Sequence, residues 1–246
     1  MNIFAVSDLH LSLTAPFDPA TPPALAKPMD MFGPAWRDMP RRLAAAWRAT
    51  VGPEDAVLLP GDLSWAMTLD EAAHDFDYLA ALPGRKIIIK GNHDYWWQSL
   101  SKVRSALPPG IVALQHDAVA VGGFAVTGTR GWLQDGHADY SAADDEHVYE
   151  RELLRLQMAL DAAAQLTLPI LALMHYPPLL TDEDSGFSRL LEQYPVVACL
   201  YGHIHGNRRA AFSGTRRGIR YVNCSVDRLG CAPRLIAAGD TLQVEN

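Results

Sequence analysis

The chain has 246 residues, of which 49% are hydrophobic, and a formal net charge of −7 at pH 7. This length suffices for one large domain or two small ones with a sizeable core, and the hydrophobic fraction excludes a largely disordered chain. An acidic protein does not attract nucleic acid or anionic membrane over a broad face, so nucleic acid is a disfavoured partner. A local positive site, such as a metal cluster, would still bind a small anion.

The sequence favours a cytoplasmic protein. Residues 1–6 lack the basic start and the long apolar run of a secretory signal, and no apolar run approaches the roughly 20 residues of a membrane helix. The three cysteines, Cys199, Cys224 and Cys231, include no Cys-x-x-Cys pair, which favours reduced and buried thiols. No feature of the sequence predicts an oligomeric state.

Taken in chain order, the first half alternates buried strands with helical patterns. Short apolar runs at 3–7, 56–59 and 86–90 are typical of strands that are buried on both faces. The capping box Thr68-Leu69-Asp70-Glu71 predicts a helix towards Leu82, where Pro83-Gly84 ends it. A shorter helix is expected from Gln98 to Leu107.

The second half continues the pattern. A long helix is predicted over 145–165, strands over 170–174 and 196–201, and short strands over 220–223, 235–238 and 242–245. This order of elements predicts a layered α/β fold of mixed sheets covered by helices. We expect a single domain over 1–246, with a Pro-rich insertion at about 11–40.

The Pro-rich insertion contains seven prolines. A loop of this length in a compact domain is usually functional or disordered. Within it, Met29-Asp30-Met31-Phe32-Gly33 either forms a lid over a metal site or packs on the far face.

Polar side chains, nearly all of them of types that bind metals, follow all five buried strands. They are Asp8 and His10, then Asp62, then Asn92 with His93 and Asp94, then His175, and finally His203 and His205. In layered α/β folds, sites form beyond the carboxyl ends of strands, so we expect these side chains to converge. Each Asp-x-His or His-x-His pair skips one residue and can offer two ligands to one site.

The ligand types indicate which metals would bind. Mixed carboxylate and imidazole ligands without thiolate suit manganese, iron or zinc better than calcium or an iron–sulfur cluster. Seven candidate ligands are too many for one tetrahedral zinc, and they fit two ions that share a carboxylate. Close backbone approach beside the metals is expected at four glycines, namely Gly61, Gly91, Gly202 and Gly206.

In this order, Asp-x-His, Gly-Asp, Gly-Asn-His-Asp, a lone His and Gly-His-x-His resemble the motifs of the calcineurin-like metallophosphoesterases. The resemblance covers the chain from Asp8 to His205. It implies an αββα sandwich of two mixed sheets flanked by helices, and two divalent or trivalent transition metal ions. It also implies the ligand sets: Asp8, His10 and His205 for one metal, Asn92, His175 and His203 for the other, and Asp62 as the bridge.

The resemblance further implies a hydrolytic mechanism. Two cations would polarise the phosphoryl oxygens and lower the pKa of a bridging water, and the resulting hydroxide would attack phosphorus. His93 would lie beside the leaving group, as a general acid or as an electrostatic stabiliser. Asp94 would orient His93 by accepting a hydrogen bond from its other ring nitrogen.

Two further features have competing interpretations. Trp96-Trp97, directly after Asp94, is interpreted as core packing in preference to substrate stacking. Arg130, in Gly128-Thr129-Arg130-Gly131-Trp132, suits bidentate phosphate recognition, but it can equally pair with Asp135 or Asp139. Arg130 is therefore a candidate substrate-binding residue, with both interpretations open.

Three classes of function remain. The first is a hydrolase of a small phosphodiester or phosphomonoester, whose partner is a small phosphorylated substrate. The second is a nuclease of the same family, which the acidic balance disfavours. The third is a non-catalytic scaffold, which the intact motifs disfavour. Asp62 is followed by Leu-Ser-Trp-Ala and not by the pattern of protein Ser/Thr phosphatases, and blocks 27–30 and 128–132 resemble a bacterial branch of predicted phosphohydrolases.

Overall fold

The computed structural model describes residues 1–206 and 211–244. Its first sheet consists of β1 (Asn2–Ala5), β2 (Ala56–Leu59), β3 (Arg85–Ile88), β4 (Ile111–Ala113), β11 (Arg234–Ala238) and β12 (Thr241–Leu242). The strand order is β12-β11-β1-β2-β3-β4. Strands β1 to β4 are parallel, whereas β11 runs antiparallel to β1 and β12 antiparallel to β11. The sheet is therefore mixed, as expected.

The second sheet is also mixed and six-stranded. It consists of β5 (Ala118–Val121), β6 (Phe124–Thr129), β7 (Ile170–Met174), β8 (Val196–Tyr201), β9 (Gly214–Arg216) and β10 (Ile219–Asn223). The order is β5-β6-β7-β8-β10-β9. The four central strands are parallel, and the two edge strands are antiparallel to their neighbours.

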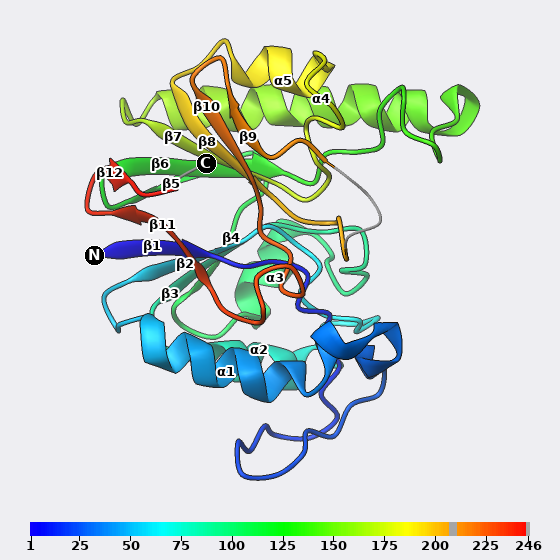
Figure 1. Cartoon of the computed structure of the whole chain (residues 1–246), viewed down its shortest axis with the longest axis vertical. Coiled ribbons are helices and arrows are strands. Elements are labelled where there is room, and N and C mark those ends of the chain that lie inside the picture. The colour runs from blue at the N-terminus through cyan, green and yellow to red at the C-terminus, as the bar shows by residue number, and fades with distance from the viewer. Residues whose placement is uncertain (207–210, 245–246) are drawn as a thin grey trace.

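Helices cover the outer face of each sheet. The first sheet is covered by α1 (Met39–Thr50), α2 (Ala73–Ala80) and α3 (Leu100–Ala106), and the second by α4 (Ala142–Ala164) and α5 (Gly186–Leu191). Figure 1 shows the resulting layers, with α4 and α5 on one side, α1 and α2 on the other, and the sheets between them. The predicted α/β fold, an αββα sandwich, is confirmed.

Alternate side chains along each strand enter different cores. In β1, Ile3 and Ala5 point into the core between the sheets, while Phe4 packs against the helices of the first sheet. In β7, Leu171 and Leu173 enter the core between the sheets, and the alternate residues Ile170, Ala172 and Met174 face α4 and α5. Such strands need apolar residues on both faces, which explains the continuous apolar runs in the sequence.

Most predicted elements are present, with shifted ends. The helix expected from Gln98 is α3, and the long helix expected from Asp145 is α4, which begins at Ala142. The predicted capping box at Thr68 forms only in part: Thr68 Oγ1 accepts a hydrogen bond from Glu71 N at 3.2 Å, but the Glu71 carboxylate accepts from Met67 N instead of Thr68 N. Regular helix begins only at Ala73. The last predicted strand, 242–245, is shorter as β12, and its residue 245 lies outside the described residues.

The Pro-rich insertion is ordered along its length in the structure. Residues Met29–Phe32 and Pro34–Trp36 form two short 3-10 helices, and Trp36 is buried. Helix α1 then begins at Met39, with Pro40 in its first turn, where proline is tolerated because that position has no intrahelical donor role. The sequence analysis included Pro40 in the insertion and so missed α1. No helix within the described residues is long and apolar enough to cross a membrane.

Candidate metal centre

The metal-binding side chains lie in loops that directly follow parallel strands. Asp8 and His10 follow β1, Asp62 follows β2, and residues 92–94 follow β3. From the second sheet, His175 follows β7, and His203 and His205 follow β8. These loops all lie at one end of the sandwich, on the right in Figure 1, because parallel strands end at the same edge of a sheet.

One group of ligand atoms consists of Asp8, His10 and His205. His205 Nε2 lies 3.4 Å from Asp8 Oδ1 and 3.3 Å from His10 Nε2. Within this group, each residue offers a ligand atom, and these atoms lie within 4.8 Å of one another. This is the set that the family resemblance implied for the first metal.

A second group surrounds Asn92. Its Oδ1 lies 2.6 Å from His175 Nε2 and 3.0 Å from His203 Nδ1. Asp62 connects this group to the first, because its Oδ2 lies 3.3 Å from His175 Nε2 and 3.8 Å from His10 Nε2. All seven predicted ligands are therefore brought together, and Asp62 lies between the two sets.

The backbone beside these ligands is held in an unusual conformation. Asp8, His10, Asp62 and His203 all have positive φ, at 59°, 46°, 53° and 68°. Non-glycine residues rarely adopt this region, and strain of this kind clusters at functional sites. The surrounding structure therefore stabilises a loop geometry that the chain does not prefer locally.

Glycines allow the loops to approach the ligands closely. A Cβ on Gly91 would lie 2.1 Å from Asp62 Oδ1, and one on Gly202 would lie 2.4 Å from Asp8 Oδ2. A Cβ on Gly61 would lie 2.9 Å from His175 Nδ1. The expected close approach is confirmed at these three glycines. At Gly206, an added Cβ would have no atom within 4 Å, so only its φ of +60° favours glycine there.

The two central carboxylates are buried and their negative charge is balanced by imidazoles. Burial alone would raise the pKa of Asp8, but the combined attraction of His205, His175 and His10, with a hydrogen bond to His205, outweighs it and holds the pKa well below its usual range. For Asp62, burial is likewise outweighed by the attraction of His175 and His10 and a hydrogen bond to His175, which together lower the pKa to about 2. Both groups are therefore carboxylates at neutral pH, which is the form that binds cations.

The four imidazoles divide into two kinds. Burial lowers the pKa of His10 to about 4 and that of His203 to about 3, so both rings are neutral. Burial opposes charge on the other two as well, but Asp62 and Asp8 together raise the pKa of His175 to about 9, and Asp8 and Asp227 together raise that of His205 to about 10. In the absence of a cation, protons on these two rings balance the carboxylates.

This donor set fits metal ions. His10 Nε2 and His205 Nε2 face each other at 3.3 Å, and His10 Nδ1 is buried with no hydrogen-bond partner among the described residues. Two facing ring nitrogens and two carboxylates crowd one small volume, where a cation would satisfy all of them and replace the protons. His, Asp and Asn ligands without thiolate suit manganese, iron or zinc.

His93 lies beside the ligand cluster and outside both ligand sets. Its ring centroid is 5.5 Å from that of His10 and 4.4 Å from that of Trp65. Its Nδ1 lies 3.3 Å from the Tyr95 hydroxyl, and burial lowers its pKa below the usual value. The backbone N–H of His93 donates to Asp62 Oδ1 at 2.7 Å, which holds both residues in register.

The prediction that Asp94 accepts a hydrogen bond from the His93 ring is wrong: within the described residues this bond does not form. Asp94 is fully buried and accepts instead from the backbone N–H groups of Gly91, Asp62, Leu63 and Ser64 and from the Trp96 indole, at 2.7–3.2 Å. Its carboxylate thus joins the loop after β2 to the loop after β3. Burial, with repulsion from Asp62, raises its pKa to about 6.

Asp227 is a functional residue that the sequence analysis missed. Its Oδ1 lies 3.1 Å from His205 Nδ1, and its Oδ2 accepts from Gly206 N at 2.7 Å. A carboxylate on the outer ring nitrogen orients the imidazole and directs Nε2 to the cluster. Asp227 follows β10 by four residues, so the strand-end pattern would have found it had that strand been searched.

Aromatic side chains surround His10. Trp65 stacks on it with a centroid distance of 4.8 Å, and Trp36, from the Pro-rich insertion, lies 5.3 Å from the ring of His205. Met29 belongs to the same wall, since its sulfur lies 3.4 Å from Trp65 Nε1. The insertion therefore lies at the metal side, and its expected alternative position on the far face is wrong. The lid remains a prediction.

Arg130 does not pair with Asp135 or Asp139. Its Nη2 lies 3.5 Å from Glu152 Oε1, and its guanidinium lies 4.4 Å from the Trp132 ring centre. Trp96 is fully buried and packs edge-to-face on Phe76, so the core interpretation of this tryptophan is confirmed.

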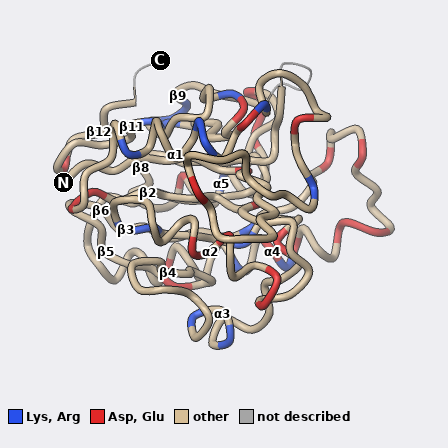
Figure 2. Tube along the Cα trace, turned by 90° about the horizontal axis from the view of Figure 1, so that it is seen from below, with Lys and Arg blue, Asp and Glu red and all other residues tan. Residues whose placement is uncertain are grey.

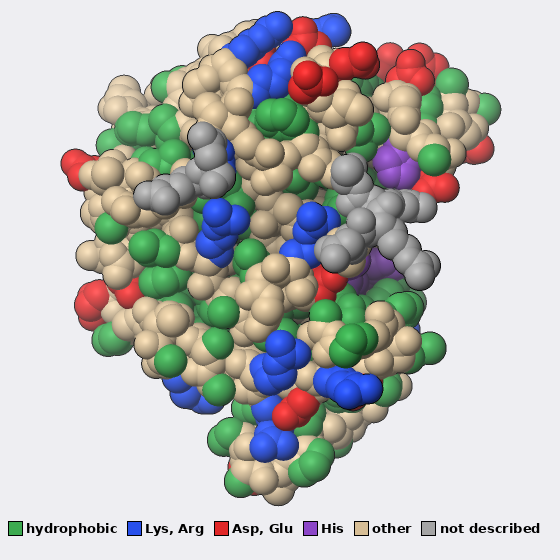
Figure 3. Space-filling view, in the orientation of Figure 1, with side chains coloured by type: hydrophobic (Ala, Val, Ile, Leu, Met, Phe, Trp, Pro, Cys, Tyr) green, Lys and Arg blue, Asp and Glu red, His purple; other side chains and the backbone are tan. Residues whose placement is uncertain are grey.

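Histidine side chains reach the surface at a hollow on the right edge of the molecule in Figure 3, between its upper and lower halves. Elsewhere, acidic and basic residues are interspersed along the described chain, as Figure 2 shows.

Solved structures share this fold. A protein of unknown function from Aquifex aeolicus superposes with a TM-score of 0.52 at 15% identity, over 95% of each chain. The phosphopantetheinyl hydrolase of Mycobacterium tuberculosis superposes with a TM-score of 0.50 at 16% identity, over 92% of this chain and 89% of that one. At such identities the likeness establishes the fold alone.

Comparison of sequences places the chain in a family. The Gene 66 protein of Mycobacterium phage L5 is 42% identical over 52 residues, which make up 21% of this chain and only 25% of the phage protein. The model of the calcineurin-like phosphoesterases matches residues 1–207, which include every ligand described above. The chain therefore belongs to the calcineurin-like phosphoesterase family.

Proposed function

We propose that this protein hydrolyses a small phosphodiester or phosphomonoester with two metal ions. Asp8, His10 and His205 hold one ion, and Asn92, His175 and His203 hold the other. Asp62 bridges them. The ions are divalent or trivalent manganese, iron or zinc, and the substrate is a small phosphorylated molecule.

The position of Asp62 is the observation that carries the proposal. One of its oxygens, Oδ2, lies between His10 Nε2 and His175 Nε2, at 3.8 and 3.3 Å. These nitrogens belong to different ligand sets, so a single carboxylate oxygen is within reach of two cations. A site for one ion would not need a buried carboxylate with ligands on both sides.

The protein supplies orientation and charge for the reaction. Bound cations polarise the phosphoryl oxygens and activate the attacking water. Asp227 and the Pro60 carbonyl fix the outer nitrogens of His205 and His175, at 3.1 Å each. These contacts direct the inner nitrogens to the cluster and raise the basicity of the ligands. Asp94 holds the loops after β2 and β3 together.

His93 is the candidate for proton transfer. It contacts the cluster without belonging to a ligand set, and Tyr95 is placed to orient it through Nδ1. Its Nε2 then carries or shares the proton that the leaving oxygen takes up. Neither a serine nor a cysteine nucleophile is required, because water attacks phosphorus directly.

The test is a panel of substrates with purified protein and added manganese. The panel contains bis-p-nitrophenyl phosphate, p-nitrophenyl phosphate, cyclic nucleotides and single-stranded DNA. We expect manganese-dependent turnover of a small phosphoester, which chelation abolishes. Turnover of single-stranded DNA in preference to every small ester would replace the proposal with a nuclease.

A further inference from the structure

A second cavity, of about 290 Å³, lies between the ends of β3, β4 and β6 and helix α4. Its lining includes four cationic side chains and one carboxylate, namely Lys90, Arg130, Arg151 and Arg155 with Glu152. None of them belongs to the metal ligands. A local excess of positive charge in a chain of net charge −7 indicates a dedicated site.

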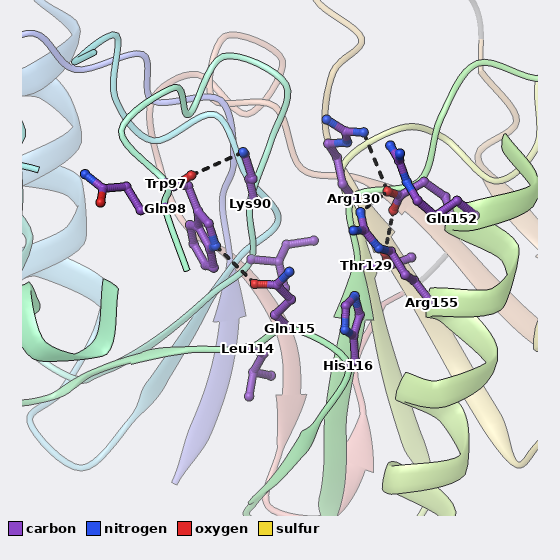
Figure 4. Close-up of a pocket in the computed structure, with 13 residues that line it drawn as sticks. Lys90, Trp97, Gln98, Leu114, Gln115, His116, Thr129, Arg130, Glu152 and Arg155 are labelled. Atoms are coloured by element: carbon purple, nitrogen blue, oxygen red, sulfur yellow. Dashed lines mark hydrogen bonds and ion pairs between the residues drawn. The ribbon is translucent and has the colours of Figure 1, made fainter. Parts of the chain in front are cut away.

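The cationic groups face one another across the cavity. Figure 4 shows Lys90 beside Trp97 on one wall, Arg130 and Arg155 with Glu152 on the opposite wall, and Gln115 between them. The lining thus combines ammonium, guanidinium and amide groups, which are the hydrogen-bond donors that oxyanions prefer.

Glu152 is saturated by its neighbours. Its side chain is 1% exposed, and its Oε1 accepts from Arg155 Nη1 at 2.6 Å and pairs with Arg130 Nη2 at 3.5 Å. Its Oε2 accepts from the Thr129 hydroxyl at 2.7 Å. One carboxylate therefore positions two guanidinium groups and cannot neutralise both.

The remaining positive charge is uncompensated within the described residues. Lys90 Nζ donates to the Trp97 carbonyl at 3.4 Å, and no carboxylate pairs with it within the described residues. Arg130 Nε is buried without a hydrogen-bond partner in the described part of the chain. Cationic groups kept partly out of water without partners cost free energy, which a bound anion would offset.

The cavity is connected to the metal centre through two segments of the chain. Lys90 precedes the ligand Asn92 by two residues, so their Cα atoms lie at most about 7.6 Å apart. The Arg130 carbonyl accepts from the backbone N–H of His175 at 3.1 Å. A ligand in the cavity is therefore adjacent to the loops that hold the metals.

We propose that this cavity binds a phosphate group. Guanidinium groups recognise phosphate bidentately, and the volume is near the lower end of the roughly 300–1,000 Å³ of small-molecule sites. The phosphate is either a second, non-reacting phosphate of the substrate or free inorganic phosphate. The first source rests on the proposed function, whereas binding in the cavity does not.

The direct test is calorimetric titration of the full chain with inorganic phosphate, both manganese-loaded and after chelation. Phosphate that binds the chelated protein cannot be bound by metals. The variant is Lys90→Gln with Arg151→Gln, and the control is Arg48→Gln, which removes the same kind of charge from α1. We expect the double variant to weaken binding by at least about tenfold, since a hydrogen bond to a charged group contributes about 1.5–3 kcal/mol.

A second variant guards against misfolding. Arg151 is exposed on α4, so Arg151→Gln alone should fold, and Arg151→Lys should lose less affinity than Arg151→Gln because it keeps the charge but not the bidentate geometry. No binding to the chelated wild type, or equal affinity in wild type, variants and control, would overturn the proposal. Neither outcome depends on turnover, so a failure of the proposed function is recognised separately.

Kinetics distinguish the two sources of phosphate. If the substrate supplies it, KM for a nucleoside 3′,5′-bisphosphate is lower than for the 5′-monophosphate, and Lys90→Gln with Arg151→Gln removes this difference. If free phosphate is the ligand, the KM ratio is unchanged by the variant, and the calorimetric loss of affinity remains.

Discussion

The metal centre and the phosphate cavity lie side by side, and each contains at least one buried carboxylate. The two sites differ in the side chains that pair with these carboxylates. Asp8 and Asp62 are paired with imidazoles, whereas Glu152 is paired with guanidinium groups. An imidazole can release its proton and bind a metal, while a guanidinium keeps its charge at any pH that a protein tolerates. The first arrangement therefore accepts cations, and the second remains positive and accepts anions.

The largest expected effect is loss of the bridging carboxylate. Asp62→Ala should lose metal and activity together, because two positive ions would then share no common ligand. The loss of activity should exceed about 100-fold, the upper range for residues that only orient a ligand. Elemental analysis and manganese-dependent hydrolysis of bis-p-nitrophenyl phosphate measure both quantities. Glu54→Ala, an exposed carboxylate just before β2, is the control. Retention of both metals by Asp62→Ala would exclude the bridging role.

His93→Ala should separate the metals from the chemistry. His93 lies outside both ligand sets, so the variant should keep its metals while kcat falls by about 10²–10⁴-fold, the usual contribution of a general acid. His147→Ala, an exposed histidine on α4, should leave kcat unchanged. A metal content that falls in parallel with kcat would instead make His93 a ligand or a structural support of one.

The metal centre could be predicted from the sequence because its chemistry is local. Asp8 and His10, and likewise His203 and His205, lie two residues apart directly after apolar runs, so both the residue types and their placement are visible. The candidate ligands follow separate strands of the sequence. Because parallel strands end at the same edge of a sheet, their convergence could be expected. The α/β class followed from the same runs.

The phosphate cavity could not be predicted, because its charges lie in segments with no shared motif. Lys90, Arg130 and Arg151 are separated by tens of residues. Taken one at a time in the sequence, each could be an ordinary charged residue on the surface. Asp94 shows the same limit within a motif. Its position beside His93 suggested a partner, yet backbone donors from the loop after β2 occupy its oxygens. Only the folded structure brings these donors together.

Asp75 is another buried carboxylate, and it accepts hydrogen bonds from neutral groups, so it isolates the effect of burial. Burial raises its pKa to about 6, despite hydrogen bonds from Ser64 Oγ and Leu13 N. The folded state therefore binds a proton that the unfolded state releases near pH 4. The stability that this proton contributes is full below pH 4 and is lost as pH rises through about 6.

Asp75→Asn should remove this pH dependence. Relative to wild type, the variant should gain up to about 3 kcal/mol in free energy of unfolding between pH 4 and pH 8, since one pKa unit corresponds to about 1.4 kcal/mol. Urea unfolding of both proteins at the two pH values measures it. Asp77→Asn, an exposed position on the same helix, is the control. Equal changes with pH in wild type and Asp75→Asn would contradict the role of burial.

Asp227→Asn should have a smaller effect on the metal centre than Asp62→Ala. Asp227 contacts His205 through the outer nitrogen, so its loss leaves the ligands in place but weakens their orientation. Manganese affinity should fall by about 10–100-fold, as for other residues that orient a ligand. At saturating manganese, kcat should return most of the way to the wild-type value. A kcat that stays low at saturation would mean that Asp227 acts on the substrate.

The smallest effect is expected from Glu152→Gln, and its sign is opposite to that of Asp62→Ala. Removing the buried carboxylate of the metal centre abolishes cation binding, whereas removing that of the cavity leaves Arg130 and Arg155 without a counter-charge. Inorganic phosphate should then bind several-fold more tightly, by about 0.5–1 kcal/mol, a modest gain because each guanidinium must also be repositioned. Calorimetry on the chelated protein measures the affinity. Glu150→Gln, an exposed position on the same helix, is the control that removes an equal charge without contacting the cavity. Weaker phosphate binding by Glu152→Gln would show that the carboxylate acts mainly by holding the two arginines in place, and that position, more than net charge, sets the affinity of the cavity.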